Sequence, residues 1–387
     1  MKFVTELIDE IELKKSQFIK ILGLSAKSTF SEEILRENID RYWNPLPTAS
    51  NQFENEYAID SSSASRTISN GIDFFIIRSI MIGKKTEPIK KLQFEMIRGI
   101  RDPSVAYTLE RILRDILEIE IIVLNKEKLR KGDLVLIDGN LYGRYTHLLK
   151  QLDLPNWEHV PLKLFDQMQK LFEICDKKEI IVAGVSKFSK TRVLSNAILS
   201  ENRGPIADPD ILDVDVLYRW KNDQAGYTKP LLLGQYATRE DEINAMSETP
   251  ENYINRFFRN IPTGKKNWGT EVISKVPDSP AITMFHFSPS PYEQPMRVDI
   301  PANCLGINKT LAEVSPYEFI DSDFVKPIVQ QLSQDWGGRD VYNALLYIAD
   351  KEVRLTFDTV DKIYRSVLAR ELNISLDYDR STRRFYR

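Results

Sequence analysis

Apolar runs of β-type composition recur along the chain and predict a sheet whose strands are separated by helices. Residues 57–59 and 134–137 are two such runs, and each leads directly into an aspartate. Residues 71–83 form another β-rich run, which we expect to pair with the first as a hairpin, so that the sheet begins antiparallel. The same kind of pattern predicts three more strands, at residues 179–185, 281–287 and 296–301.

Helical spacing of apolar residues separates these runs. Residues 5–23, and a short stretch that opens near Ser31, predict an N-terminal helical arm. Residues 106–124 place apolar side chains on one broad arc, which predicts a long helix. Further helices are predicted at about residues 161–175, 209–220, 323–332, 342–350 and 359–372.

These elements divide the chain into three parts. We expect a helical arm over residues 1–48, one α/β domain over residues 49–350, and a C-terminal helix with a basic tail over residues 351–387. Residues 220–278, rich in Pro, Gly and Asn, have the least regular pattern and are expected to form an insertion in the domain.

Composition narrows the class of protein. The chain has 387 residues, of which 42% are hydrophobic and 28% charged, as is typical of a globular protein. A net charge of -3 excludes a global basic field, so contact with DNA requires a local basic lining. Cys175 and Cys304 are far apart without zinc-type spacing, and no apolar run approaches membrane-spanning length. These features predict a cytoplasmic protein that does not contact a membrane.

Asp60 and Asp138 are candidate metal ligands because each stands at the tip of a predicted strand. An acid in that position stays near solvent while the strand fixes its direction, as a divalent-metal site requires. The alternative is that each acid only starts a turn, and Asp138 followed by Gly139 is a common turn dipeptide.

The predicted long helix supplies a third carboxylate. Glu120 lies inside its apolar arc, where a carboxylate is costly unless a cation or a metal pairs with it. A glutamate that reaches solvent at the helix end is the alternative. Glu118 falls on the opposite side, and it remains a second choice because the helix phase is not fixed to within a few residues. The order of Asp strand, strand, Glu helix and Asp strand is typical of a ribonuclease H-like mixed β-sheet flanked by helices.

His286 lies in the predicted strand 281–287 between aromatic residues. Beside an acidic metal cluster, its neutral imidazole would bind the metal or orient the attacking water. A histidine that alternates with large apolar residues is also typical of a hydrogen-bonded core position. His147 and His159 lack this setting.

A Ser/Lys loop follows the predicted strand 179–185. Lys187 and Lys190 in this loop are candidate phosphate contacts, and a solvated basic turn is the alternative. Tyr218, in the acidic-fronted helix predicted at residues 209–220, is a further candidate for the site, although helix capping and core packing explain that segment almost as well.

Basic and aromatic residues are interleaved in the irregular region. Arg256, Arg259 and Trp268 suit single-stranded nucleic acid, in which bases stack on rings and phosphates meet cations. A charge-rich surface loop explains the same residues.

In chain order, these motifs resemble the NurA nuclease family. The resemblance runs over roughly residues 50–350, and it rests on an ordered set of motifs: residues 58–62, the helix glutamate, residues 136–141, residues 182–187, and the His286 strand followed by residues 297–301. Ser61 departs from the family pattern, which often has Gly there, and Asn140 stands where Ser is usual.

The resemblance implies a ribonuclease H/Argonaute-PIWI-like core, a ring-shaped homodimer, manganese-dependent DNA cleavage, and docking onto a hexameric HerA-type translocase. It also implies that Asp60, Glu120 or Glu118, Asp138 and His286 form the metal site. A family tyrosine near the site would correspond to Tyr218.

The resulting hypothesis is phosphodiester hydrolysis assisted by Mn²⁺ or Mg²⁺, of exonuclease and single-strand endonuclease type, in DNA end processing or defence. Two other functions fit the same residues. One is a catalytically silent nuclease-like module for DNA binding or assembly, and the other is a phosphohydrolase acting on small nucleotides.

Overall fold

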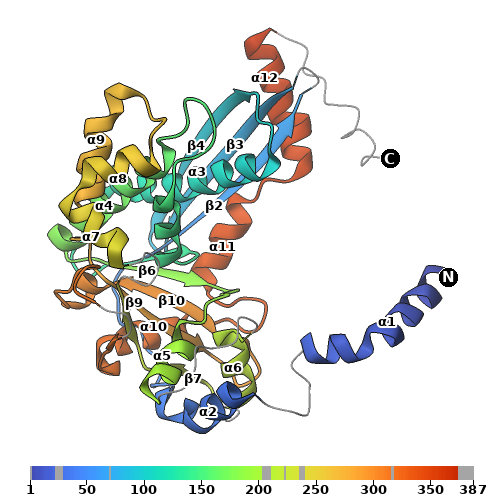
Figure 1. Cartoon of the computed structure of the whole chain (residues 1–387), viewed down its shortest axis with the longest axis vertical. Coiled ribbons are helices and arrows are strands. Elements are labelled where there is room, and N and C mark those ends of the chain that lie inside the picture. Colours follow the sequence, from blue (N-terminus) through green and yellow to red (C-terminus); the bar gives the residue numbers. More distant parts are fainter. Residues whose placement is uncertain are drawn as a thin grey trace.

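The computed structural model describes residues 2–21, 29–68, 71–202, 211–221, 224–234, 240–314 and 318–373. Its centre is a mixed sheet, which has eleven strands within these ranges and helices on both faces (Figure 1). The strands are β1 (Trp43–Pro45), β2 (Glu56–Thr67), β3 (Ile72–Gly83), β4 (Thr86–Arg98), β5 (Leu134–Asp138), β6 (Ile181–Ser186), β7 (Gly226–Thr228), β8 (Leu231–Leu233), β9 (Ile282–Ser288), β10 (Met296–Pro301) and β11 (Glu318–Phe319).

The helices come from all parts of the chain. They are α1 (Lys2–Ile21), α2 (Phe30–Asn38), α3 (Pro103–Leu124), α4 (Val160–Lys178), α5 (Val193–Glu201), α6 (Asp213–Trp220), α7 (Glu240–Glu248), α8 (Pro250–Phe257), α9 (Thr263–Ser274), α10 (Lys326–Gln334), α11 (Ala344–Val353) and α12 (Arg365–Leu372). A π-helical turn, Thr359–Tyr364, precedes α12. No helix in the described ranges is long and apolar enough to cross a membrane.

The strand order is β1-β7-β9-β10-β6-β5-β2-β3-β4, with β8 and β11 attached beside β9. β2, β5 and β6 run parallel to one another, whereas the pairs β2–β3, β3–β4, β6–β10 and β9–β10 are antiparallel. The carboxyl ends of the three parallel strands therefore meet at one edge of the sheet.

Side-chain alternation sends successive residues of each central strand into two separate cores. Ile59 and Ile137 belong to the larger core, which includes buried side chains of α3 and α4. Ala58 and Leu136 belong to the smaller core, which they share with side chains of α10 and α11, among them Leu346. Each strand residue near the carboxyl edge can thus be assigned to the α3 face or to the α11 face.

The predicted mixed sheet flanked by helices is confirmed, and so is the antiparallel pairing of β2 with β3. The pattern of hydrophobic and polar residues did not predict β4. This strand lies at the end of the strand order, and most of its side chains are exposed or half-buried, so it lacks the apolar run that marks an interior strand.

The prediction for residues 220–278 was wrong in one respect, because much of this region is helical. α7, α8 and α9 lie within it and appear together beside α4 in Figure 1. Pro250 begins α8 and Pro262 directly precedes α9. A proline in the first turn of a helix costs no hydrogen bond, so these prolines mark helix starts and do not interrupt helices.

The N-terminal helix α1 is separate from the sheet, and the predicted C-terminal tail lies outside the described residues. Figure 1 shows α1 set apart from the sheet, and the side chains of Phe3, Leu7 and Leu13 on it are exposed. The predicted basic tail lies in residues 374–387, which are outside the described ranges.

Candidate active site

Asp60 and Asp138 lie next to each other on parallel strands. Ile59 of β2 is paired with Ile137 of β5, so the two aspartates come directly after this pair. Each aspartate lies two residues beyond a side chain of the smaller core and therefore projects toward the α11 face. β5 ends at Asp138, whereas β2 continues past Asp60 into the long hairpin with β3.

Asp60 is buried, with only 4% of its surface exposed. Its Oδ1 accepts a hydrogen bond from the backbone N–H of Ser61 at 2.7 Å. Burial, and then the nearby charges of Asp138 and Glu118, raise the pKa of Asp60 to about 8. In the part of the chain that the structure describes, no Lys or Arg forms an ion pair with it.

Asp138 has a basic and an aromatic neighbour on the same face. Lys187 Nζ, from the loop after β6, lies 3.2 Å from Asp138 Oδ2 and 4.0 Å from the centre of the Tyr342 ring. The Tyr342 hydroxyl donates a long hydrogen bond of 3.5 Å to the same carboxylate oxygen. Burial, followed by the charges of Asp138, Asp60 and Asp350, raises the pKa of Tyr342, so this phenol stays protonated.

Sequence reasoning did not identify Tyr342 or Asp350 as parts of this site. Tyr342 precedes α11, and Asp350 lies within it. The predicted helix at residues 342–350 contained both side chains, but nothing local indicates that α11 packs beneath the two aspartates. Only the three-dimensional arrangement brings the three carboxylates within electrostatic range of one phenol.

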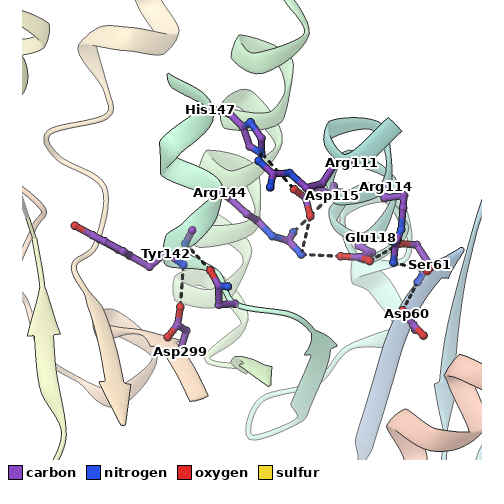
Figure 2. Close-up of polar contacts among 12 residues, drawn as sticks. Asp60, Ser61, Arg111, Arg114, Asp115, Glu118, Tyr142, Arg144, His147 and Asp299 are labelled. Carbon is purple, nitrogen blue, oxygen red and sulfur yellow. Dashed lines mark hydrogen bonds and ion pairs between the residues drawn. The ribbon is translucent and has the colours of Figure 1, made fainter. Parts of the chain in front are cut away.

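Glu118 lies on the other face of β2. Ser61 Oγ donates a hydrogen bond to its Oε1, and Arg144 donates to its Oε2 at 2.6 Å. Arg114 in turn donates to Ser61 Oγ at 3.1 Å and to the Ser61 carbonyl at 2.7 Å. Figure 2 shows this cluster around Ser61, with Asp60 at its edge.

The cluster around Glu118 is a buried network of charges. Burial raises the pKa of Glu118, and the charges of Arg144 and Arg114 oppose that rise. Arg144 also lies 3.4 Å from Asp115, and Arg111 is 3.1 Å from His147 Nε2 (Figure 2). Because both carboxylate oxygens of Glu118 already have partners, this residue supports Ser61 in the structure and does not face the α11 side.

Glu120, the first choice from the helical wheel, points elsewhere. It forms ion pairs with Lys91 Nζ of β4 at 2.9 Å and with Lys163 Nζ of α4 at 3.1 Å. Burial raises its pKa, but the hydrogen bonds and charges of the two lysines outweigh burial and lower it. Glu120 lies in the apolar arc of α3 but faces Lys91 and Lys163, because α3 packs against α4 as well as the sheet and its apolar arc does not face the sheet alone.

The structure does not bring His286 to the aspartates. It lies on β9, which β10, β6 and β5 separate from β2, so four strand spacings place it roughly 19 Å from Asp60. The imidazole is fully buried, and no described residue forms a hydrogen bond with either ring nitrogen. Burial and the nearby charge of Arg297 lower its pKa to about 3. His286 is therefore a neutral core residue here and cannot share a metal ion with Asp60.

The remaining candidates divide by location. Lys190 is exposed in the same loop as Lys187. Tyr218 is 55% exposed on α6, a helix that contacts α2 and α5, and no contact joins it to the aspartates in the described residues.

The interleaved basic and aromatic residues lie in the helical group α7–α9. Arg256 and Arg259 are exposed, and the Arg256 guanidinium lies 4.8 Å from the centre of the Phe257 ring. Trp268 is half-buried against the larger core, with its ring edge-on to His159. This tryptophan is thus mainly a packing residue, and only the arginines are fully open to a ligand.

No group of three His, Cys, Asp or Glu side chains in the described residues converges closely enough to hold a metal ion. The site offers two adjacent carboxylates, with a third at longer range on α11. Proteins commonly bind Mg²⁺ through one or two carboxylates, while water and substrate phosphate supply the other ligands. The paired aspartates satisfy that requirement.

Comparison with known proteins identifies the fold. A family model described as "NurA domain" matches residues 54–355. A crystal structure of NurA with manganese is 10% identical, covers 93% of this chain and 97% of its own, and has a TM-score of 0.56. A second crystal structure of NurA is 12% identical, covers 95% of this chain and 97% of its own, and has a TM-score of 0.52. A crystal structure of NurA bound to dAMP and manganese is 11% identical, covers 95% of this chain and 95% of its own, and has a TM-score of 0.50. The sequence matched no functionally curated protein.

Proposed function

Because this chain belongs to the NurA family, we propose that it is a metal-dependent deoxyribonuclease that hydrolyses phosphodiester bonds at Asp60 and Asp138. One observation carries the proposal: two carboxylates on adjacent parallel strands face the same side, and the buried one has no ion pair in the described residues. Such a pair attracts a divalent cation and can hold it against a phosphate.

The donor atoms suit the hard ions. Asp60 and Asp138 offer only oxygen, which favours Mg²⁺ or Mn²⁺ over the softer metals. Burial and the charge of Asp138 raise the pKa of Asp60 to about 8, because a second negative charge beside Asp138 is unfavourable without a counter-ion. A divalent cation between the two carboxylates would displace the Asp60 proton and remove this repulsion. The NurA crystal structure that contains dAMP and manganese supports the same assignment.

The side chains around the aspartates have separable roles in this proposal. When bound, the ion stabilises charge on the phosphate and lowers the pKa of water. Lys187 exchanges its contact with Asp138 for a phosphate oxygen and neutralises part of its charge. Tyr342 stays protonated and donates its hydrogen bond to Asp138 or to the substrate.

Glu118 acts on the site indirectly. It accepts a hydrogen bond from Ser61 Oγ, and the Ser61 N–H donates to Asp60. Glu118, Arg144 and Arg114 together fix Ser61 and hence the direction of the Asp60 carboxylate. We therefore assign Glu118 the role of a positioning residue and not that of a metal ligand.

We further propose DNA as the polymer, with cleavage of single strands and of duplex ends. The family resemblance supports a homodimer and a HerA-type hexameric translocase as partner, in DNA end processing or defence. A net charge of -3 fits a nuclease to which a partner feeds DNA, because the protein has no general attraction for a polyanion.

The decisive experiment is cleavage of end-labelled single-stranded and linear duplex DNA in Mn²⁺, Mg²⁺ or EDTA. We expect metal-dependent products, and a loss of more than about 100-fold in Asp60→Asn and Asp138→Asn, since loss of a ligand exceeds the 10- to 100-fold cost of changing an outer partner. Asp278→Asn, at an exposed aspartate, is the matched control and should cleave normally.

Three outcomes would reject the proposal. Equal cleavage by wild type and both variants would place the chemistry elsewhere. Intact DNA under every condition, with a cognate translocase added, would favour the silent DNA-binding module, and turnover of mononucleotides alone would favour the small-molecule phosphohydrolase.

A further inference from the structure

Two aromatic side chains are almost fully exposed at the edge of the sheet that carries Asp138. Phe188, in the loop after β6, is 81% exposed, and Tyr292, in the loop between β9 and β10, is 79% exposed. A single exposed apolar residue is ordinary on a protein surface. Here the two share one edge, and that edge ends at the candidate active site.

The strand pairing fixes where Phe188 lies. Val185 of β6 is paired with Asp138, and Phe188 is three residues further along, after β6 ends at Ser186 and the chain bends, so it lies at most roughly 10 Å further along the chain. Between them, Lys187 reaches back to Asp138 at 3.2 Å. A phosphate held by Lys187 therefore lies within about one or two nucleotides of the Phe188 ring.

Tyr292 continues the same edge away from the aspartates. Ser186, at the end of β6, is paired with Arg297 at the start of β10, and Arg297 is paired with His286 near the end of β9. The loop that carries Tyr292 joins β9 and β10 at this end. Figure 1 shows β6, β9 and β10 grouped in this part of the sheet.

The Phe188 loop is anchored although its aromatic tip is exposed. Ser189 is buried, and its Oγ accepts a hydrogen bond from the Thr191 N–H at 3.4 Å. The Thr191 carbonyl accepts one from the Asp213 N–H at 2.9 Å. Exposed Lys190, two residues after Phe188, adds a second positive charge to this loop. An exposed aromatic ring on an anchored loop, with a lysine on either side in the sequence, is a combination that suits unpaired bases and their phosphates.

We propose that Phe188 and Tyr292 form a stacking track for the unpaired bases of a DNA strand whose phosphate occupies the Asp60–Asp138 site. The inference rests on the proposed nuclease function and adds its substrate form, a single strand led along the sheet edge from β5 toward β9. Phe188, adjacent to Lys187, is the first platform and Tyr292 the second.

The test measures binding separately from cleavage. Fluorescence anisotropy with a short single-stranded DNA in Ca²⁺ or EDTA should show about 5- to 100-fold weaker binding for Phe188→Ala, since stacking on one ring contributes about that factor. Phe188→Trp should bind like wild type. Tyr107→Ala, which removes an aromatic side chain that is 68% exposed at the start of α3, is the matched control and should change nothing.

An abasic series shows whether the ring meets a base. DNA with one abasic position, moved along the strand, should erase the penalty of Phe188→Ala at one position and that of Tyr292→Ala at a neighbouring position. An unfolded variant would instead lose binding to every substrate, and its thermal melt would reveal this.

The outcomes separate the inference from the function on which it rests. If wild type cleaves DNA but both alanine variants bind all substrates as tightly as Tyr107→Ala, the stacking track is overturned and the nuclease stands. A penalty of equal size on abasic and intact DNA also overturns the track. If wild type neither binds nor cleaves DNA even with a cognate translocase added, the proposed function and the track both fail.

Discussion

β2 carries two buried carboxylates on the same face, four residues apart, and they differ in what surrounds them. Glu56 begins the strand, and burial, with a contribution from Asp335, raises its pKa to about 8. Asp60 reaches about the same pKa through burial and the charges of Asp138 and Glu118. A shifted pKa therefore does not by itself distinguish a functional carboxylate from a structural one.

The partners of each carboxylate make the distinction. Lys84 Nζ lies 2.5 Å from Glu56 and 2.9 Å from Asp335, and Gln331 donates to Glu56 at 3.2 Å. That group has its own cation and belongs to the packing of α10 against the sheet. Asp60 has only a backbone N–H as a hydrogen-bond donor among the described residues. Among these two carboxylates, the one without a basic partner in the described residues is the one left to pair with a metal ion.

The largest expected effect is on stability as a function of pH in the metal-free protein. The pKa of Asp60 rises on folding from its ordinary value near 4 to about 8, so the folded state binds this proton more tightly than the unfolded state. The resulting stabilisation is present below pH 4 and is lost as the pH rises toward 8. Asp60→Asn removes this titration. Its free energy of unfolding, relative to that of wild type, should therefore rise by about 3 kcal/mol from pH 5 to pH 8.

Urea unfolding in EDTA at several pH values checks this expectation. The quantity to follow is the difference in free energy of unfolding between Asp60→Asn and wild type. A difference that stays constant from pH 5 to pH 8 would show that Asp60 has an ordinary pKa and would remove the electrostatic argument for a cation. Asp278→Asn serves as the exposed control.

Removal of the cation from the Glu56 group should have the next largest effect. Lys84→Met leaves Glu56 and Asp335 close together without a positive charge, and we expect a loss of about 2 kcal/mol in the free energy of unfolding. The value is modest because the Lys84 side chain is 38% exposed and solvent already screens part of the interaction. DNA cleavage by Lys84→Met below its melting temperature should be unchanged. Asp60→Asn should instead lose cleavage while its stability at neutral pH does not fall.

The measurement is a thermal melt together with the cleavage assay. Lys84→Arg, which keeps the charge, should recover most of the stability. Loss of cleavage in a folded Lys84→Met protein would mean that the Glu56 group takes part in the reaction, and the contrast between the two carboxylates would fail.

Local pattern was sufficient to find the apolar runs that lead into Asp60 and Asp138, because such a run is visible in a few consecutive residues. It placed the strand end correctly at Asp138 but wrongly at Asp60, since β2 continues to Thr67 through its pairing with β3. It was also sufficient for the mixed sheet and the long helix. It could not show which of Glu118 and Glu120 lies near Asp60, because α3 packs against α4 as well as the sheet and both contacts contribute to its apolar arc. β4 escaped detection for a related reason, since a strand at the end of the sheet needs few apolar residues.

Long-range contacts account for the rest. Tyr342 and Asp350 follow Asp60 by nearly 300 residues, and only the packing of α11 against β2 brings them close. His286 shows the converse, because its alternation with large apolar residues is the same whether a strand lies beside the aspartates or four strands away. The order of the strands in the sheet decides that question, and the sequence does not display it.

The smallest expected effect tests the contrast most directly, through stabilisation by Mn²⁺. A ligand that binds only the folded state at ten times its dissociation constant adds about 1.4 kcal/mol to the free energy of unfolding. Wild type and Glu56→Gln should both gain this amount, and Asp60→Asn should gain none. Because the ion competes with the proton on Asp60, the gain at a fixed Mn²⁺ concentration should grow from pH 6 to pH 8. A Mn²⁺ shift that survives Asp60→Asn but disappears in Glu56→Gln would reverse the two assignments, since it would place the ion at the carboxylate that already has Lys84 beside it.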